Sequence, residues 1–177
     1  MAKLNREAMA HYLDTGMHPN YYSTGTTAVS PSWEIIGEDI EEMSVELNPN
    51  TDQIKNILGN TKTKDDGYEP TMSADPFYAD PDSALYTKVR DIALGRKKGA
   101  DCKTLMLEVI VEDSAATNFL AYVQEVMVKP QSYGGDTAGL NFPFNVMEDG
   151  ARYKGYVTKA SVTAGSPVFS VGEVPSN

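Results

Sequence analysis

The chain has 177 residues and a formal net charge of −10, with 25 Asp and Glu against 15 Lys and Arg. So acidic a chain argues against a protein that grips nucleic acid phosphates or docks onto an anionic membrane, because both need a basic face. No apolar run approaches the roughly 20 residues that span a bilayer, and the N-terminus lacks the apolar core of a secretory signal. We therefore expect residues 1–177 to form one domain, with no membrane partner, in the cytoplasm where it is made.

The N-terminal part predicts a short strand and then a long loop. Residues 10–13 form a short apolar-alternating piece, which is typical of a strand. Residues 16–31 are rich in turn-forming Gly, Pro, Asn and Ser and predict a loop. Loops longer than about 12–15 residues are uncommon in compact domains unless they have a function. We expect this loop, which contains Tyr21 and Tyr22, to make assembly contacts.

An acidic strand is predicted next, within residues 33–47. Apolar and polar side chains alternate over its second half, which is the pattern of a half-buried strand. The predicted inward side chains are Met43, Val45 and Leu47, and the outward ones include Glu42, Ser44 and Glu46. The Asn-Pro-Asn sequence at 48–50 predicts a turn that ends this strand.

The following region predicts a strand, a polar loop and a helix. Residues 53–58 are a strand candidate ended by Gly59, and residues 61–66 are a polar loop closed by Gly67. After an extended stretch over 68–78, Leu85, Val89 and Ile92 recur at helical spacing behind Asp82 or Ser83 as the N-cap. These residues predict one helix at about 83–95.

The remainder returns to a period of two residues and predicts further strands at 105–111, 120–128, 142–146, 153–158 and 168–171. Asp149-Gly150 is the strongest hairpin signal in the chain and predicts a turn between the third and fourth of these. Residues 172–177 are expected to be a loose tail. About eight strands and one helix indicate a mainly β fold, either two packed sheets or one strongly curved sheet, with the helix covering one side.

The residues that could carry chemistry do not form a catalytic set. His11 and His18 have no spacing that makes a metal pair, and Cys102 opens an apolar strand as a small core residue would. The glycine-rich stretch 133–139 lacks the Lys and Ser or Thr of a phosphate-binding loop, so a bulge or tight turn is expected there. The sequence predicts no enzyme, no cofactor and no metal.

The distribution of charge is the most informative feature. Residues 33–52 contain seven acids and no Lys or Arg; the acids are Glu34, Glu38, Asp39, Glu41, Glu42, Glu46 and Asp52. Like charges crowded on one surface repel each other, so their presence indicates a use for a negative surface.

Seven short blocks in this order resemble the major tail tube protein of long-tailed phages of Gram-positive hosts. The blocks are WEIIGEDIEE at 33–42, VELNPN at 45–50, KNILG at 55–59, GYEP at 67–70, DPFY at 75–78, SYGGDT at 132–137 and FPFN at 142–145. The resemblance implies a structural virion protein with a β-sandwich or barrel flanked by a helix. Such subunits form rings, usually hexameric, that stack into the hollow tail through which DNA passes, with tape measure, terminator and distal tail proteins as further partners.

The resemblance also suggests roles for particular residues. Six subunits of −10 each would carry −60, and acids on the lumen wall would repel the DNA backbone within about 8 Å at physiological salt. We expect Glu41, Glu42 and Glu46 to line this lumen. The segments 48–52 and 61–67 are expected to be assembly loops, through Asn48, Asp52, Lys62, Lys64, Asp65 and Asp66.

Two other interpretations remain open. One is another tail component with the same fold, such as a tail terminator or the tube of a contractile particle. The other is a small acidic β-sandwich module that binds a protein or sugar, which would stay monomeric at high concentration. The scattered acids, without a convergent pocket, argue against an enzyme.

Overall fold

The fold is that of a computed structural model, which describes residues 3–24 and 29–176. The described α-helices are α1 (Tyr21–Thr24), α2 (Ala84–Leu94) and α3 (Lys159–Thr163), and short 3-10 helices span Arg6–Ala8 and Gly99–Cys102. The described strands are β1 (Met9–Asp14), β2 (Trp33–Ile36), β3 (Val45–Glu46), β4 (Pro49–Lys55), β5 (Thr61–Tyr68), β6 (Thr71–Ala74), β7 (Lys103–Ile110), β8 (Asn118–Pro130), β9 (Gly134–Asp136), β10 (Gly139–Asn141), β11 (Phe144–Thr158) and β12 (Phe169–Val171).

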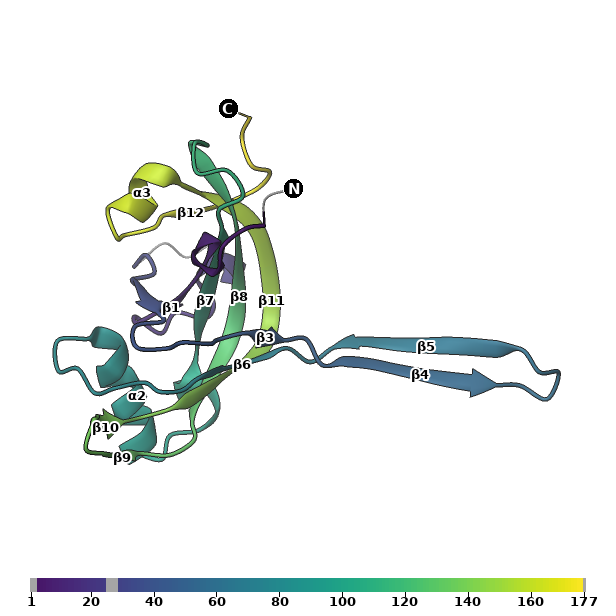
Figure 1. The fold of residues 1–177 in the computed structure, drawn as a ribbon, viewed down its shortest axis with the longest axis horizontal. Coiled ribbons are helices and arrows are strands. Elements are labelled where there is room, and N and C mark those ends of the chain that lie inside the picture. The colour runs from purple at the N-terminus through teal and green to yellow at the C-terminus, as the bar shows by residue number, and fades with distance from the viewer. Residues whose placement is uncertain (1–2, 25–28, 177) are drawn as a thin grey trace.

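One curled antiparallel sheet forms the body of the molecule (Figure 1). Its strands follow the order β2-β1-β7-β8-β11-β6-β3, and β12 pairs with the last part of β11. The ribbons β4–β5 and β9–β10 are separate two-stranded sheets. This confirms the prediction of a mainly β fold with one main helix, in the form of a strongly curved sheet.

The sheet carries a buried core on each of its faces. Tyr12 and Leu107 are partners across β1 and β7 and belong to one hydrophobic cluster. The next pair along, Leu13 and Met106, belongs to the other cluster. Successive side chains of a strand point to opposite faces, so the two clusters lie on opposite sides of the sheet. Helix α2 covers the Leu13 face, and α1, α3 and β12 contribute to the Tyr12 face.

Helix α2 confirms the prediction at 83–95. It spans Ala84–Leu94 and buries Leu85, Val89 and Ile92. The Ser83 side chain caps it by accepting a hydrogen bond from the Tyr86 backbone N–H, 3.0 Å away. Glu34 of β2 adds a second cap, since its carboxylate accepts from the Leu85 N–H at 2.9 Å and from the Ser83 hydroxyl. One of the seven acids of residues 33–52 is therefore used inside the fold.

The predicted hairpin turn at Asp149-Gly150 is wrong, because β11 runs without a break from Phe144 to Thr158. The pairing with β8 shifts register between Glu148 and Arg152, which marks a β-bulge. Gly150 adopts a φ of +120° there, and a Cβ on it would lie 2.0 Å from an oxygen of Glu125. The glycine thus permits a bulge in a long strand, where the dipeptide had indicated a turn.

The strand predicted within residues 33–47 is not continuous, because Trp33–Ile36 forms β2 and only Val45–Glu46 of its second half pairs, as β3. Met43 is buried and Val45 half-buried as expected, but Leu47 is 53 % exposed. Residues 37–44 instead form an irregular connection from β2 to β3. The alternation of burial survives at Met43 and Val45 because they cover one edge of the α2-side core.

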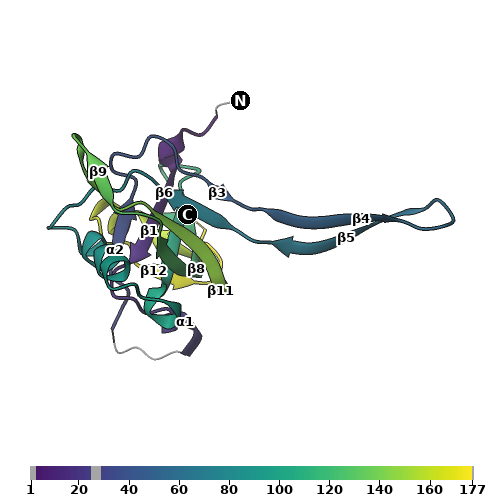
Figure 2. The same cartoon turned by 90° about the horizontal axis from the view of Figure 1, so that it is seen from below.

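Two expected loops are strands. The segments 48–52 and 61–67 were expected to be loops, but residues 49–52 belong to β4 and residues 61–67 to β5, and these two strands pair along their length. Together they form a ribbon that projects far from the body (Figures 1 and 2). We call residues 49–68 the arm.

The predicted loop at 16–31 contains helix α1, although its residues 25–28 lie outside the described residues. Asp14 joins the two ends of this segment: its buried carboxylate accepts hydrogen bonds of 2.9 Å from the backbone N–H groups of Gly16, His18 and Ser32. The tail over 172–176 has no helix or strand, and Asn177 is not described. No helix within residues 3–24 and 29–176 is long and apolar enough to cross a membrane.

Candidate functional site

The arm exposes almost all of its surface. Every residue of β4 and β5 is exposed except Gly67, which is half-buried. A two-stranded ribbon that packs against nothing is at best marginally stable in water. The arm therefore has the form of a segment that is stabilised by contact with another molecule.

The tip of the arm is apolar and well defined. Ile57 is fully exposed and Leu58 is 79 % exposed. The Asn56 side chain holds the turn by accepting hydrogen bonds from the N–H groups of Leu58 at 3.0 Å and Asn60 at 2.9 Å. Gly59 supplies the positive φ, +81°, that the turn requires. Large apolar side chains held in the open by a formed turn are typical of a binding surface.

Charge is divided along the arm. Residues 53–64, its outer half, contain Lys55, Lys62 and Lys64 and no acid. The inner half carries Asp52, Asp65 and Asp66. The outer half of the arm is thus a local basic segment of +3 on a chain of net charge −10.

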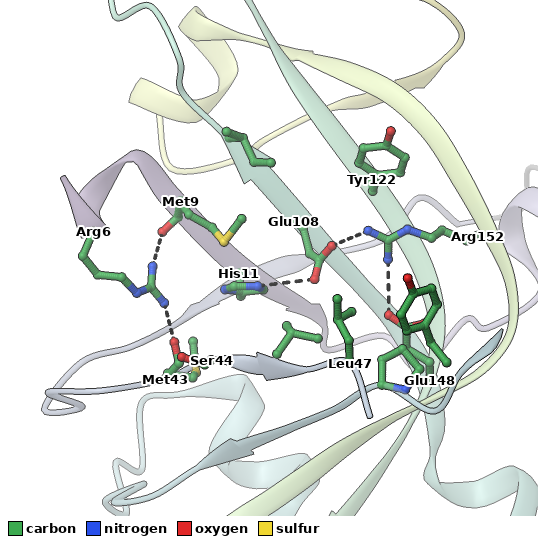
Figure 3. A pocket seen from close by; sticks show the side chains of 14 residues that line it. Arg6, Met9, His11, Met43, Ser44, Leu47, Glu108, Tyr122, Glu148 and Arg152 are labelled. Carbon is green, nitrogen blue, oxygen red and sulfur yellow. Dashed lines mark hydrogen bonds and ion pairs between the residues drawn. The ribbon is translucent and has the colours of Figure 1, made fainter. Parts of the chain in front are cut away.

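An open groove of about 750 Å³ lies at the foot of the arm (Figure 3). It is lined by Arg6, Met9, His11, Met43, Ser44, Val45, Leu47, Tyr68, Pro70, Glu108, Ile110, Tyr122, Glu148 and Arg152. Its floor continues the sheet face of Leu13 and Met106, since His11 and Glu108 lie two residues further along the same strands. The groove is mainly apolar, with a few charged groups on its floor.

The charged groups on the floor form one network. Arg152 Nη2 lies 2.6 Å from Glu108 Oε2, and Arg152 Nη1 lies 3.3 Å from Glu148 Oε1. The guanidinium also stacks over the Tyr122 ring, 4.6 Å from its centroid. His11 Nε2 lies 3.4 Å from the other Glu108 oxygen (Figure 3).

The two carboxylates on Arg152 differ in their pKa. Burial acts to raise the pKa of Glu108, but His11 and Arg152 beside the carboxylate outweigh burial, so the pKa lies below its ordinary value. Burial raises the pKa of Glu148, and the attraction of Arg152 does not offset it. Glu108 is therefore the anion that the fold favours in this network.

The acidic segment lies beside the groove. Glu38, Asp39, Glu41, Glu42 and Glu46 are all exposed. Met43 is shared between the groove and two smaller hollows, one lined by Glu41 and the other by Glu42 and Glu46. We call the three acids that line these hollows, Glu41, Glu42 and Glu46, the acidic lip.

The structure brings together most of the residues expected to act in assembly. Asp52, Lys62, Lys64, Asp65 and Asp66 all lie on the arm, in strands and not in loops. Asn48 lies at the foot of the arm, where its side chain donates a 3.0 Å hydrogen bond to the Glu69 carbonyl.

The two N-terminal tyrosines lie elsewhere. Tyr21 and Tyr22 belong to α1 and pack on the opposite face of the sheet from the groove. The Tyr22 ring packs against Phe169 at 5.4 Å and Tyr153 at 5.8 Å, and burial raises its pKa. Tyr22 is thus half-buried against the core of its own chain.

The sequence patterns did not predict the groove. Glu108 interrupts the apolar run 105–111, and a charged residue on a buried strand position is the signal that could have indicated a partner nearby. That partner, Arg152, is 44 residues away and its location depends on the bulge in β11.

Comparison with known proteins identifies no family. No family model matches the sequence, and no curated protein matches it. Among solved structures, the chain is similar to the sheath/tube terminator of an extracellular contractile injection system, PVC, in its extended state. The match has a TM-score of 0.49 and 10% sequence identity, and it covers 86% of this chain and 97% of that chain.

Proposed function

We propose that the protein is a structural subunit of a phage tail, whose copies form rings that stack into a tube for DNA. The observation that carries this proposal is the arm, a ribbon of about 20 residues that buries nothing within its own chain. A segment of this kind is stabilised when it packs on a neighbouring copy. The ordered sequence blocks that resemble tail tube proteins support the same function.

The open edges of the sheet support self-assembly as well. In the described part of the chain, β2 and β3 end the strand order of the main sheet. Unpaired strand edges present free N–H and C=O groups to another chain. Rings of subunits, hexameric as in the tail tube proteins that the sequence blocks resemble, would pair such edges around a closed circle.

The charge of the chain suits a conduit. A wall that carries net negative charge does not retain DNA phosphates, so the DNA stays free to slide. The three acids expected on the lumen, Glu41, Glu42 and Glu46, are exposed and available either to the lumen or to a neighbouring subunit. Other tail proteins would bind at the two ends of the tube.

Electron microscopy of the purified protein, with sedimentation over a range of concentrations, tests the proposal. We expect hollow tubes of stacked rings. A variant with residues 51–66 replaced by Gly-Gly should keep the circular dichroism spectrum of the body and form no tubes. Single rings that never stack would favour a tail terminator, and a monomer that persists at high concentration would contradict the proposal in favour of a binding module.

A further inference from the structure

We propose that the arm tip of one copy docks into the groove of a second copy, with Ile57 and Leu58 as the apolar anchors. This inference rests on the proposed self-assembly and names the contact that drives it. The occupant is a second copy because the same chain carries both an unpartnered apolar tip and an open apolar groove.

The two surfaces cannot meet within one chain. Leu47 lies in the groove at the foot of the arm and Leu58 at its tip, 11 residues later. An extended strand rises about 3.3 Å per residue, so 11 residues of extended chain hold them up to roughly 36 Å apart. Both views of the ribbon show the arm pointing away from the body (Figures 1 and 2). Docking of the tip therefore requires another copy.

The groove and the tip match in chemistry. The groove presents Met9, Val45, Leu47 and Ile110 around a floor whose charges already pair with one another. Its volume of about 750 Å³ accepts two side chains of leucine size. Apolar anchors in a pocket surrounded by polar groups are the usual centre of a protein interface.

The surrounding charges match as well. Lys55, Lys62 and Lys64 flank the tip, and the acidic lip flanks the groove. Docking would bring these opposite charges together and steer the arm to the groove. In this arrangement Glu42 and Glu46 face the lysines of the neighbour and not the lumen.

The contact is heterologous, because it joins two different patches on the two copies. Each copy then still offers a free tip or a free groove, so the contact repeats from copy to copy. It closes into a ring if the rotation allows and otherwise continues as a helical stack.

Cysteine cross-linking between different copies tests the contact. Leu58→Cys protein and affinity-tagged Leu47→Cys protein are mixed under assembly conditions and oxidised, so that a mixed dimer can only be intermolecular. The native Cys102 is fully buried. The matched control pairs Leu58→Cys with Val168→Cys, a 64 % exposed apolar site outside the groove. We expect mixed dimers at least about tenfold more abundant in the first mixture.

The outcomes separate the two proposals. Tubes in micrographs without selective cross-linking would overturn the docking and leave the proposed function standing. Selective cross-linking without tubes would support the docking but not the tube. A chain that stays monomeric and gives no cross-links would overturn both.

Two sets of substitutions provide independent tests. The double substitution Ile57→Asp and Leu58→Asp should raise the concentration needed for assembly at least about tenfold without changing the fold. The control Val168→Asp should leave that concentration unchanged. Lys62→Glu with Lys64→Glu should also weaken assembly, and combining it with Glu42→Lys and Glu46→Lys should restore it. The contact would be contradicted if the tip variant assembled at the same concentration as the parent protein. It would also be contradicted if the charge exchange did not restore assembly.

Discussion

Arg152 reaches Glu108 across the whole width of β8. The two residues lie on β11 and β7, which both pair with β8 and not with each other, yet their charged groups approach to 2.6 Å. The guanidinium spans the gap by stacking on Tyr122 of the central strand. This bridge ties three strands together on the floor of the groove.

We expect Glu108 and Glu148 to affect stability with opposite signs. The pKa of Glu108 is lowered in the folded state, so its contribution is complete above the ordinary value of 4.5 and is lost as the pH falls through the lower folded pKa. The pKa of Glu148 is raised, so folding disfavours its charged form as the pH rises. Glu108→Gln should lower the free energy of unfolding by about 1–3 kcal/mol at pH 7, whereas Glu148→Gln should leave it unchanged or raise it slightly.

Urea unfolding of the two variants at pH 7 and at pH 3.5 checks this difference. The difference in unfolding free energy between the parent protein and Glu108→Gln should be smaller at the lower pH, because protonation of Glu108 removes the charge that the substitution also removes. Equal losses of unfolding free energy for both variants at pH 7 would contradict the different roles assigned to Glu108 and Glu148.

The carboxylate of Asp14 is expected to stabilise the segment after β1. It is almost fully buried and accepts three backbone hydrogen bonds of 2.9 Å. Asp14→Ala leaves these N–H groups unpaired and should cost at least about 2 kcal/mol of unfolding free energy. Asp113→Ala is the control, since Asp113 accepts a similar 2.9 Å bond from Ala115 on the exposed surface. Unfolding curves that shift equally for both would argue against the role of Asp14.

The cap that Glu34 places on α2 is open to a direct test. Its carboxylate binds the Leu85 N–H and the Ser83 hydroxyl at the start of the helix. Glu34→Ala should therefore destabilise the protein by about 1–2 kcal/mol. Glu38→Ala, which removes an exposed acid of the same segment, should have almost no effect in thermal unfolding.

A methyl group at Gly150 should disturb the bulge in β11. The added Cβ would meet Glu125 Oε2 at 2.0 Å, and the φ of +120° is strained for any other residue. Gly150→Ala should cost about 1–3 kcal/mol. Gly59→Ala isolates the backbone strain, because φ is +81° there but nothing lies within 4 Å. If chemical denaturation showed that Gly150→Ala lowers the free energy of unfolding less than Gly59→Ala does, the clash with Glu125 would be ruled out.

Local patterns predicted the elements that bury one face. Helix α2 was predicted because Leu85, Val89 and Ile92 share a helical face behind an N-cap, and all three are buried there. Strands β7, β8 and β12 overlap their predicted ranges because their alternating apolar side chains also pack on a core. Asp149-Gly150 failed because the same dipeptide suits a bulge as well as a turn, and only the pairing with β8 decides between them.

The sequence by itself determined the acidic charge, the mainly β class, the position of α2 and the concentration of acids between residues 33 and 52. Only the tertiary structure decided that residues 49–68 form an arm and that a groove lies at its foot. The arm has solvent on both faces, so its strands carry no hydrophobic alternation that a sequence could reveal. The groove depends on strand register, which brings Glu108, Tyr122 and Arg152 together from three separate strands.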